Sequence, residues 1–155
     1  GSHSEYEEQP DFLPDKFESG TLNVIGLAGL NASLEWIQSI GIEAIQTHGQ
    51  ILCQQLIDGL RSIPSIKVFG LLDANLQTAV VSLTIDGVDN AMAGNILDED
   101  YDILCRIGLH CAPAAIKTIN AFPNGTIRFS FGYFNNHDEV RAAIQAVQEI
   151  TKRKK

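Results

Sequence analysis

The spacing of apolar residues changes at Pro64, and this change restricts the chain to a fold that combines helices with strands. Before Pro64, apolar residues recur at helical spacing, which predicts one helix after Thr21 or Asn23 and a second over about residues 42–63. Gly41 separates the two and is a typical helix stop. Beyond Pro64, short runs rich in valine, isoleucine and threonine predict strands at 66–69, 78–85, 103–107 and 126–131.

Three further helices are predicted between and after these strands. They cover about residues 90–101, capped by Asp89, residues 111–119, and a final segment capped by Asn135 or Asn136. The order of elements predicts an α+β fold, in which helices cover one face of a small antiparallel or mixed sheet of three to four strands.

The predicted helices carry apolar stripes that are expected to be buried. In the first helix the stripe comprises Val24, Ile25, Leu27, Ala28, Leu30, Leu34 and Ile37. In the second it comprises Ile45, His48, Leu52, Leu56 and Leu60, and in the last Val140, Ala143, Ile144, Val147 and Ile150.

Length and composition are those of a globular domain with a core of its own. The chain has 155 residues, of which 45% are hydrophobic and 19% charged. We interpret residues 1–4 as an expression-tag remnant, residues 5–20 as an extended leading segment, and residues 21–155 as a single α+β domain. The net charge of −8 argues against a nucleic-acid partner, and no apolar run has the length of a membrane span.

The three cysteines, Cys53, Cys105 and Cys111, do not form a disulfide pattern. An odd number without tight spacing favours a reducing, cytoplasmic setting. No pair of cysteines has zinc-ligand spacing and the histidines are scattered, so we predict no metal site. Cys53 and Cys105 are read as core residues, because each lies within a predicted helix or strand.

Cys111 has surroundings that suit a reactive thiol. It follows His110 directly, lies in a glycine-bearing turn, and has Arg106 five residues before it. Nearby positive charge stabilises the thiolate, which is the reactive form of cysteine. The alternative is a buried structural cysteine, and these residues alone leave both readings open. His110 is either an acid–base group or a residue that orients the turn.

Arg128 lies within a predicted strand, where an arginine needs a partner. Its planar guanidinium suits a carboxylate held by two hydrogen bonds, and the alternative is an ion pair with one of the chain's own acidic residues. Arg106 has the same two readings.

Three segments, in order and with matching spacing, resemble those of cysteine desulfurases of the class V aminotransferase family. Residues 17–23 (FESGTLN) resemble the FEAGTPN segment of the group II (SufS-like) desulfurases and selenocysteine lyases. Residues 106–113 (RIGLHCAP) resemble their RxGHHCAxP loop, and residues 125–135 (GTIRFSFGYFN) resemble their GxxRxSxxxYN strand and turn. The resemblance covers the chain from about Pro10 to Ile150.

This resemblance implies that the chain is the C-terminal, small domain of a pyridoxal-phosphate enzyme of fold type I. Cys111 matches the nucleophile that accepts sulfur from L-cysteine as a persulfide while alanine is released, with His110 beside it. Arg128 matches the arginine that binds the substrate carboxylate, and Arg106 the arginine beside the catalytic loop. Thr21, with Asn23, matches residues that reach the cofactor phosphate of the neighbouring subunit in a homodimer. A sulfur-acceptor protein is a further implied partner.

The chain departs from the family pattern in three ways. Leu22 replaces the usual proline, and Leu109 replaces the first histidine of the loop. No lysine has the context of the one that holds pyridoxal phosphate, since Lys16, Lys67 and Lys117 do not match it. We therefore expect the isolated chain not to turn over substrate.

Two other classes of function stay open from the sequence. One is a domain of another class V aminotransferase-like enzyme, such as a transaminase, epimerase or selenocysteine lyase, in which Cys111 would be dispensable. The other is a non-catalytic sulfur-carrier or binding module.

Overall fold

The computed structural model describes residues 5–18 and 20–153, which divide into two compact units on either side of the bond between Ile42 and Glu43. The proposed tag remnant, residues 1–4, lies outside the described residues. In the first unit, residues 12–18 form turns, in which the Lys16 amide donates to the Phe12 carbonyl and the Glu18 amide to the Pro14 carbonyl.

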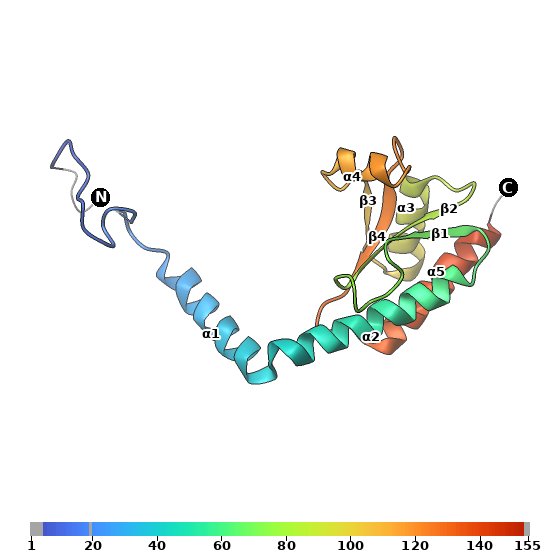
Figure 1. The fold of residues 1–155 in the computed structure, drawn as a ribbon, viewed down its shortest axis with the longest axis horizontal. Helices are drawn as coiled ribbons and strands as arrows, with labels where there is room; N and C mark the ends of the chain where they lie inside the picture. The colour runs from blue at the N-terminus through green and yellow to red at the C-terminus, as the bar shows by residue number, and fades with distance from the viewer. Residues whose placement is uncertain (1–4, 19, 154–155) are drawn as a thin grey trace. The chain divides into compact units, whose positions relative to one another are not determined.

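Helix α1 (Val24–Ile40) is the regular element of the first unit (Figure 1). The Asn23 side chain caps it by accepting a hydrogen bond from the Gly26 amide at 3.0 Å. Gly41 ends it with a φ of +90°, a conformation that glycine adopts without steric cost. The predicted burial of the α1 stripe is wrong, because no residue of this helix is buried. Helical spacing of apolar residues does not identify a surface that covers them.

The second unit, together with Ile42, contains four helices and four strands among its described residues. They are α2 (Ile42–Arg61), β1 (Ile66–Phe69), β2 (Val80–Ile85), α3 (Asn90–Tyr101), β3 (Arg106–Gly108), α4 (Pro113–Thr118), β4 (Thr126–Ser130) and α5 (His137–Lys152). The strands form one antiparallel sheet in the order β1-β2-β4-β3. The predicted α+β fold is therefore confirmed, and the sheet is antiparallel throughout.

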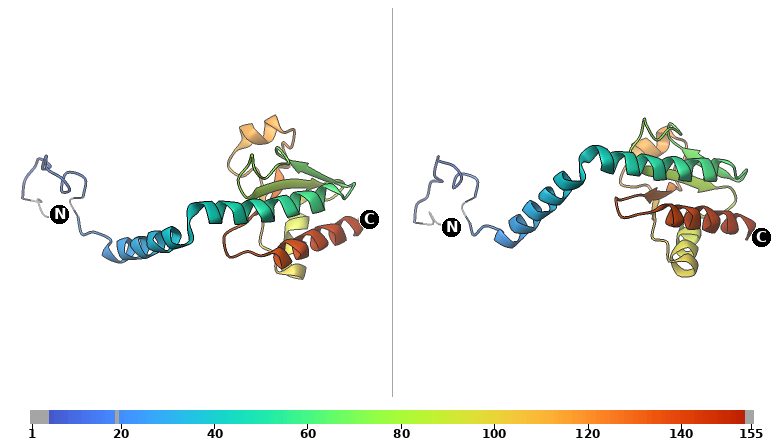
Figure 2. Two further views of the ribbon diagram at one scale, coloured as in Figure 1. Left: turned by 60° about the horizontal axis from the view of Figure 1, so that its bottom comes forward. Right: turned by 90° about the horizontal axis from the view of Figure 1, so that it is seen from below.

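One face of this sheet packs against helices and forms the core. Alternate residues of β2 and β4 are buried on this face, where α2 and α5 run side by side (Figures 1 and 2). A Cβ at Gly59 of α2 would meet the side chain of Ile144 of α5, which shows how closely these helices pack. The core includes Leu52, Leu56, Leu60, Val81, Leu83, Leu97, Ile127, Phe129, Val140, Val147 and Ile150.

The other face of the sheet, called here the site face, carries the alternate residues. The register places Phe69, Ser82, Arg128 and Arg106 in one row across all four strands. These side chains are exposed or half-buried, whereas their neighbours in the strand sequence include fully buried residues such as Ile127. The site face is therefore the polar face of the sheet.

Capping residues and other local sequence signals set most of the helix and strand ends. The Asp89 side chain accepts from the amides of Ala91 and Met92 and starts α3. Asn136 and Glu139 form a capping box at the start of α5. Strand β3 begins at Arg106, three residues later than predicted, after Asp102 ends α3 in a left-handed conformation.

No helix within residues 5–18 and 20–153 combines the length and apolarity that a membrane crossing requires.

Candidate active site

Cys111 lies in the turn that joins β3 to α4, beside the site face. Helix α4 begins at Pro113, because proline fits the first turn of a helix and interrupts a helix elsewhere. Cys111 thus precedes α4, whereas the sequence predicted that a helix begins at Cys111 itself. Its side chain is exposed, which is required of a thiol that meets a substrate.

The backbone of this turn is held in an uncommon conformation. His110 and Cys111 both adopt left-handed φ angles, of +54° and +58°, which cost non-glycine residues about 1–2 kcal/mol each. The Ala112 amide donates to the Leu109 carbonyl at 2.9 Å and closes the turn. Strain of this kind persists only where surrounding contacts enforce it, and it is frequent at functional sites.

Gly125 packs against the start of this turn. A Cβ at position 125 would overlap the carbonyl group of Gly108, so the segment before β4 packs backbone to backbone against the start of the Cys111 turn. Gly125 also has a φ of +74°. Both observations explain why this position requires glycine.

Arg106 and Cys111 are in direct contact. The Nη2 atom of Arg106 donates to the Cys111 sulfur at 3.2 Å. The guanidinium thus holds the sulfur through a hydrogen bond. The structure therefore places side by side two residues that lie five positions apart in the sequence.

Arg106 also lies directly opposite Arg128 across the β3–β4 ladder. Like charges in such a cross-strand pair are unfavourable. Neither arginine forms an ion pair with another described residue, so the alternative reading of Arg128 as half of an internal ion pair is not supported within residues 5–18 and 20–153. The Nε atom of Arg128 is buried and lacks a hydrogen-bond partner among them. Such a pair of guanidinium groups suits an anion, and a carboxylate in particular.

His110 turns away from solvent and contacts Thr126, the first residue of β4. Its Nε2 atom lies 2.8 Å from the Thr126 Oγ1 atom. Burial lowers the pKa of His110 below 6.5, and the positive charges of Arg128 and Arg106 lower it further. His110 is therefore neutral at pH 7. The sequence analysis did not identify Thr126, although strand alternation places it on the same face as Arg128.

The other two cysteines have the surroundings of core residues. Cys53 is fully buried in α2 and Cys105 is half-buried. Burial raises the pKa of both thiols, which keeps them protonated at neutral pH.

Thr21 and Asn23, the predicted cofactor-binding residues, lie in the first unit. Thr21 is exposed, and the Asn23 side chain is engaged in capping α1. No metal-binding group of three or more His, Cys, Asp or Glu side chains occurs in the part of the chain that the structure describes.

The three lysines considered from the sequence have other partners. Lys16 contacts Asp11, whereas Lys67 and Lys117 lie over the rings of Phe69 and Phe122. The guanidinium groups of Arg106 and Arg128 and the thiol of Cys111 suit a carboxylate and a sulfur atom.

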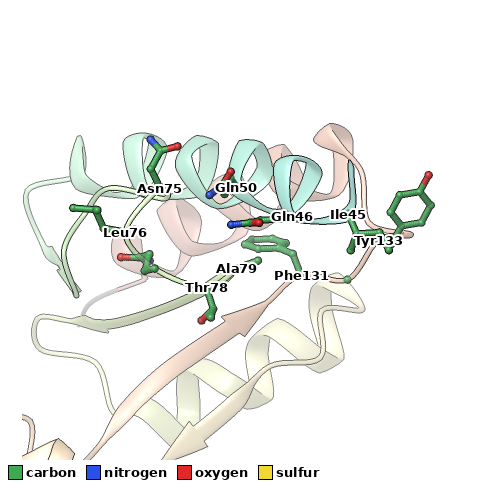
Figure 3. Close-up of a pocket in the computed structure, with 12 residues that line it drawn as sticks. Ile45, Gln46, Gln50, Asn75, Leu76, Thr78, Ala79, Phe131 and Tyr133 are labelled. Carbon is green, nitrogen blue, oxygen red and sulfur yellow. The ribbon is translucent and has the colours of Figure 1, made fainter. Parts of the chain in front are cut away.

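A hollow of about 570 Å³ lies apart from Cys111, between α2, the loop before β2 and the segment after β4 (Figure 3). Phe131 lies at its centre beneath Gln46 and Gln50 of α2, and Tyr133 points away from it. The lining contains no charged side chain and none of the predicted site residues. The hollow therefore contains none of the groups that the predicted cysteine chemistry requires.

Comparison with known proteins identifies the family of this domain. The sequence model of the family described as aminotransferase class-V matches residues 2–143. The chain therefore belongs to the class V aminotransferase family.

Individual relatives give a finer comparison. A probable cysteine desulfurase of Methanothermobacter thermautotrophicus is 36% identical over 139 residues, which is 89% of this chain and 34% of that protein. One from Vibrio cholerae is 35% identical over 137 residues, 88% of this chain and 32% of that protein. The solved cysteine desulfurase of Thermococcus onnurineus superimposes with a TM-score of 0.82 at 32% identity, over 90% of this chain and 34% of that one. The chain thus spans about a third of the length of these relatives.

Proposed function

We propose that the chain is the C-terminal domain of a group II cysteine desulfurase, and that residues 21–155 form a single domain of that larger enzyme. The observation that carries this proposal is the 3.2 Å contact between Arg106 and the exposed Cys111 thiol, beside an Arg128 that has no ion-pair partner among the described residues. The family membership and the similarity to cysteine desulfurases support it. Three unpaired cysteines agree with a reducing, cytoplasmic compartment.

In this proposal each site residue has one role. Arg128 binds the α-carboxylate of L-cysteine through its planar guanidinium. Arg106 holds the Cys111 sulfur through the hydrogen bond from its guanidinium. Thr21 and Asn23 are assigned to the cofactor phosphate of a neighbouring subunit in a homodimer. His110 shapes the turn that presents Cys111.

The reaction is a transfer of sulfur from the substrate to Cys111. The thiolate attacks the substrate sulfur, and a sulfur–sulfur bond forms while the substrate Cβ–S bond breaks. The electron pair of that bond stays with Cβ, and a proton then completes the methyl group of alanine. Cys111 is left as a persulfide, which an acceptor protein removes. Pyridoxal phosphate, when bound to the complete enzyme, supplies the electron sink for this cleavage.

The test uses a fusion of this chain to the part of the Thermococcus onnurineus enzyme that it does not cover. Cofactor absorbance first establishes that the fusion binds pyridoxal phosphate. After addition of L-cysteine, we expect a mass increase of one sulfur atom on the peptide that contains Cys111, together with release of alanine. The matched variant Cys111→Ser should show neither.

The same experiment separates the alternatives. If the cofactor binds and an amino acid reacts, but Cys111 gains no sulfur, the desulfurase proposal is wrong and a transaminase or epimerase is favoured. Transfer of selenium from selenocysteine, without transfer of sulfur from cysteine, would assign a selenocysteine lyase.

A further inference from the structure

Asn90, the first residue of α3, has a buried side chain that contacts the turn before β4. The side chain Nδ2 atom donates to two backbone carbonyls, that of Asn124 at 3.1 Å and that of Gly125 at 3.0 Å. A carbonyl oxygen only accepts hydrogen bonds, so the amide nitrogen faces this turn with one hydrogen for each carbonyl. A helix side chain that is only 7% exposed thus holds backbone that lies 34 and 35 positions further along the chain.

The segment that Asn90 holds contacts the turn that joins β3 to α4 at two consecutive positions. Gly125 packs against the carbonyl group of Gly108, where this turn begins. Thr126 is the next residue and is fully buried, and its hydroxyl oxygen lies 2.8 Å from the Nε2 atom of His110. A shift of the segment before β4 would therefore disturb both contacts.

Helix α3 also contacts the strand that leads into the same turn. A Cβ at Gly94 would lie 3.0 Å from the side chain of Ile107 in β3, which shows how closely these two elements pack. Gly94 lies four residues after Asn90 and therefore on the same side of the helix. One face of α3 thus contacts both backbone segments that flank the turn: β3 through packing, and the start of β4 through two hydrogen bonds.

The turn depends on outside contacts because its own backbone conformation is unfavourable. His110 and Cys111 have left-handed φ angles, which non-glycine residues keep only where the surrounding structure holds them there. The hydrogen bond from the Ala112 amide to the Leu109 carbonyl closes the turn. Loss of an outside contact should therefore increase the local opening of this hydrogen bond.

We infer that Asn90 is a positioning residue, whose two hydrogen bonds keep the Cys111 turn in the conformation that places the thiol beside Arg106. Asn90 acts through the backbone of Gly125 and through Thr126, and not on the sulfur itself. The importance of this role for sulfur transfer rests on the proposed function, whereas the link between Asn90 and the turn does not.

The test measures how fast the Ala112 amide hydrogen exchanges with water, by nuclear magnetic resonance of the 155-residue chain without substrate or cofactor. Asn90→Asp keeps the shape of the side chain and removes both donors. We expect the Ala112 amide to exchange about tenfold faster in this variant, because two hydrogen bonds no longer oppose opening of the turn. A carboxylate in the first turn of a helix is favourable for the helix itself, so a weaker α3 would not explain such a change.

The matched control is Tyr101→Phe, which removes a hydrogen bond at the opposite end of α3. The Tyr101 hydroxyl donates to Glu149 at 2.7 Å and joins α3 to α5. We expect the Ala112 exchange rate of this variant to stay within about twofold of the wild-type rate, because the lost contact is not shared with the turn. An unchanged rate in Asn90→Asp overturns the inference, as does an equal increase in Tyr101→Phe.

A second variant decides the question if Asn90→Asp does not fold. Asn90→Ala removes the same two donors without adding charge, and the same increase in Ala112 exchange is expected. In the wild type, the side-chain amide hydrogens of Asn90 should also exchange more slowly than those of the exposed Asn120, and equal rates would contradict the hydrogen bonds on which the inference rests. None of these measurements depends on desulfurase activity, so failure of this inference is distinct from failure of the proposed function.

Discussion

Arg106 lies directly across the β3–β4 ladder from Arg128, and the side chain of Arg106 reaches the Cys111 sulfur at 3.2 Å. Two like charges in a cross-strand pair cost stability, by about 0.2–1 kcal/mol on the scale of such pairs. An anion placed between them would offset this cost. Under the proposed function, the substrate therefore binds with its carboxylate at Arg128 and its sulfur toward Cys111.

Replacing Arg106 should slow the reaction of Cys111 with an alkylating reagent. In Arg106→Gln the sulfur loses the adjacent positive charge, and we expect a fall of about three- to tenfold in the alkylation rate at neutral pH, as an interaction of about 1 kcal/mol implies. Iodoacetamide labelling followed by mass analysis measures this rate. Arg106→Lys keeps the positive charge and should retain most of the wild-type alkylation rate. An unchanged rate in Arg106→Gln would show that the contact does not activate the thiol.

Replacing Gly125 by alanine should destabilise the second unit. The added Cβ overlaps the Gly108 carbonyl, and the left-handed backbone penalises any side chain. We expect a loss of about 2–5 kcal/mol, from about 1–3 kcal/mol of overpacking and about 1–2 kcal/mol of backbone strain. Urea unfolding measures the change. The control is Gly132→Ala, an exposed position where the new Cβ has room, with an expected change within about 0.5 kcal/mol. Equal stability of the two variants would contradict this account.

Much of the fold was predictable because its signals are local. The four predicted strands and the caps Asp89 and Asn136 were found near the expected positions, since caps and strand periodicity depend on neighbouring residues alone. The predicted burial of the α1 stripe was wrong, because burial depends on a covering surface that apolar spacing does not identify.

The site was predictable only in part, for the same reason. The sequence identifies three candidate residues by type and local context: a cysteine in a glycine-bearing turn, Cys111, and two arginines in predicted strands, Arg106 and Arg128. Their mutual arrangement depends on strand register, which pairs Arg106 with Arg128 across a gap of 22 positions in the sequence. The contact of Thr126 with His110 depends on the same register and on the close approach of Gly125 to Gly108. No local pattern in the sequence encodes either relationship.

The three cysteines should react in a fixed order in the native chain. Cys111 is exposed and should be alkylated first, Cys105 is half-buried and should follow, and Cys53 is fully buried and should react last. Burial also raises the pKa of the Cys53 and Cys105 thiols, which reduces their thiolate fraction. Peptide mapping over a time course measures the order, with labelling in urea as the control for equal intrinsic reactivity. Early modification of Cys53 would contradict the packing of α2.

His110 should make the stability of the chain depend on pH just below neutrality. Its pKa is lowered in the folded state, first by burial and then by the charges of Arg128 and Arg106. Between that lowered pKa and the ordinary value of 6.5, the unfolded chain binds more protons than the folded chain. The free energy of unfolding should therefore decrease as the pH falls through this window, and this contribution is complete above 6.5.

Urea unfolding of the wild type and of His110→Gln across this pH range isolates the contribution of His110. The glutamine variant keeps a polar side chain beside Thr126 but cannot take up a proton, so its stability should decrease less as the pH is lowered. His137 is exposed, and His137→Gln is the matched control, which should follow the wild type. If His110→Gln and the wild type lose stability in parallel, His110 is not held neutral by its surroundings, and the assignment of its environment fails.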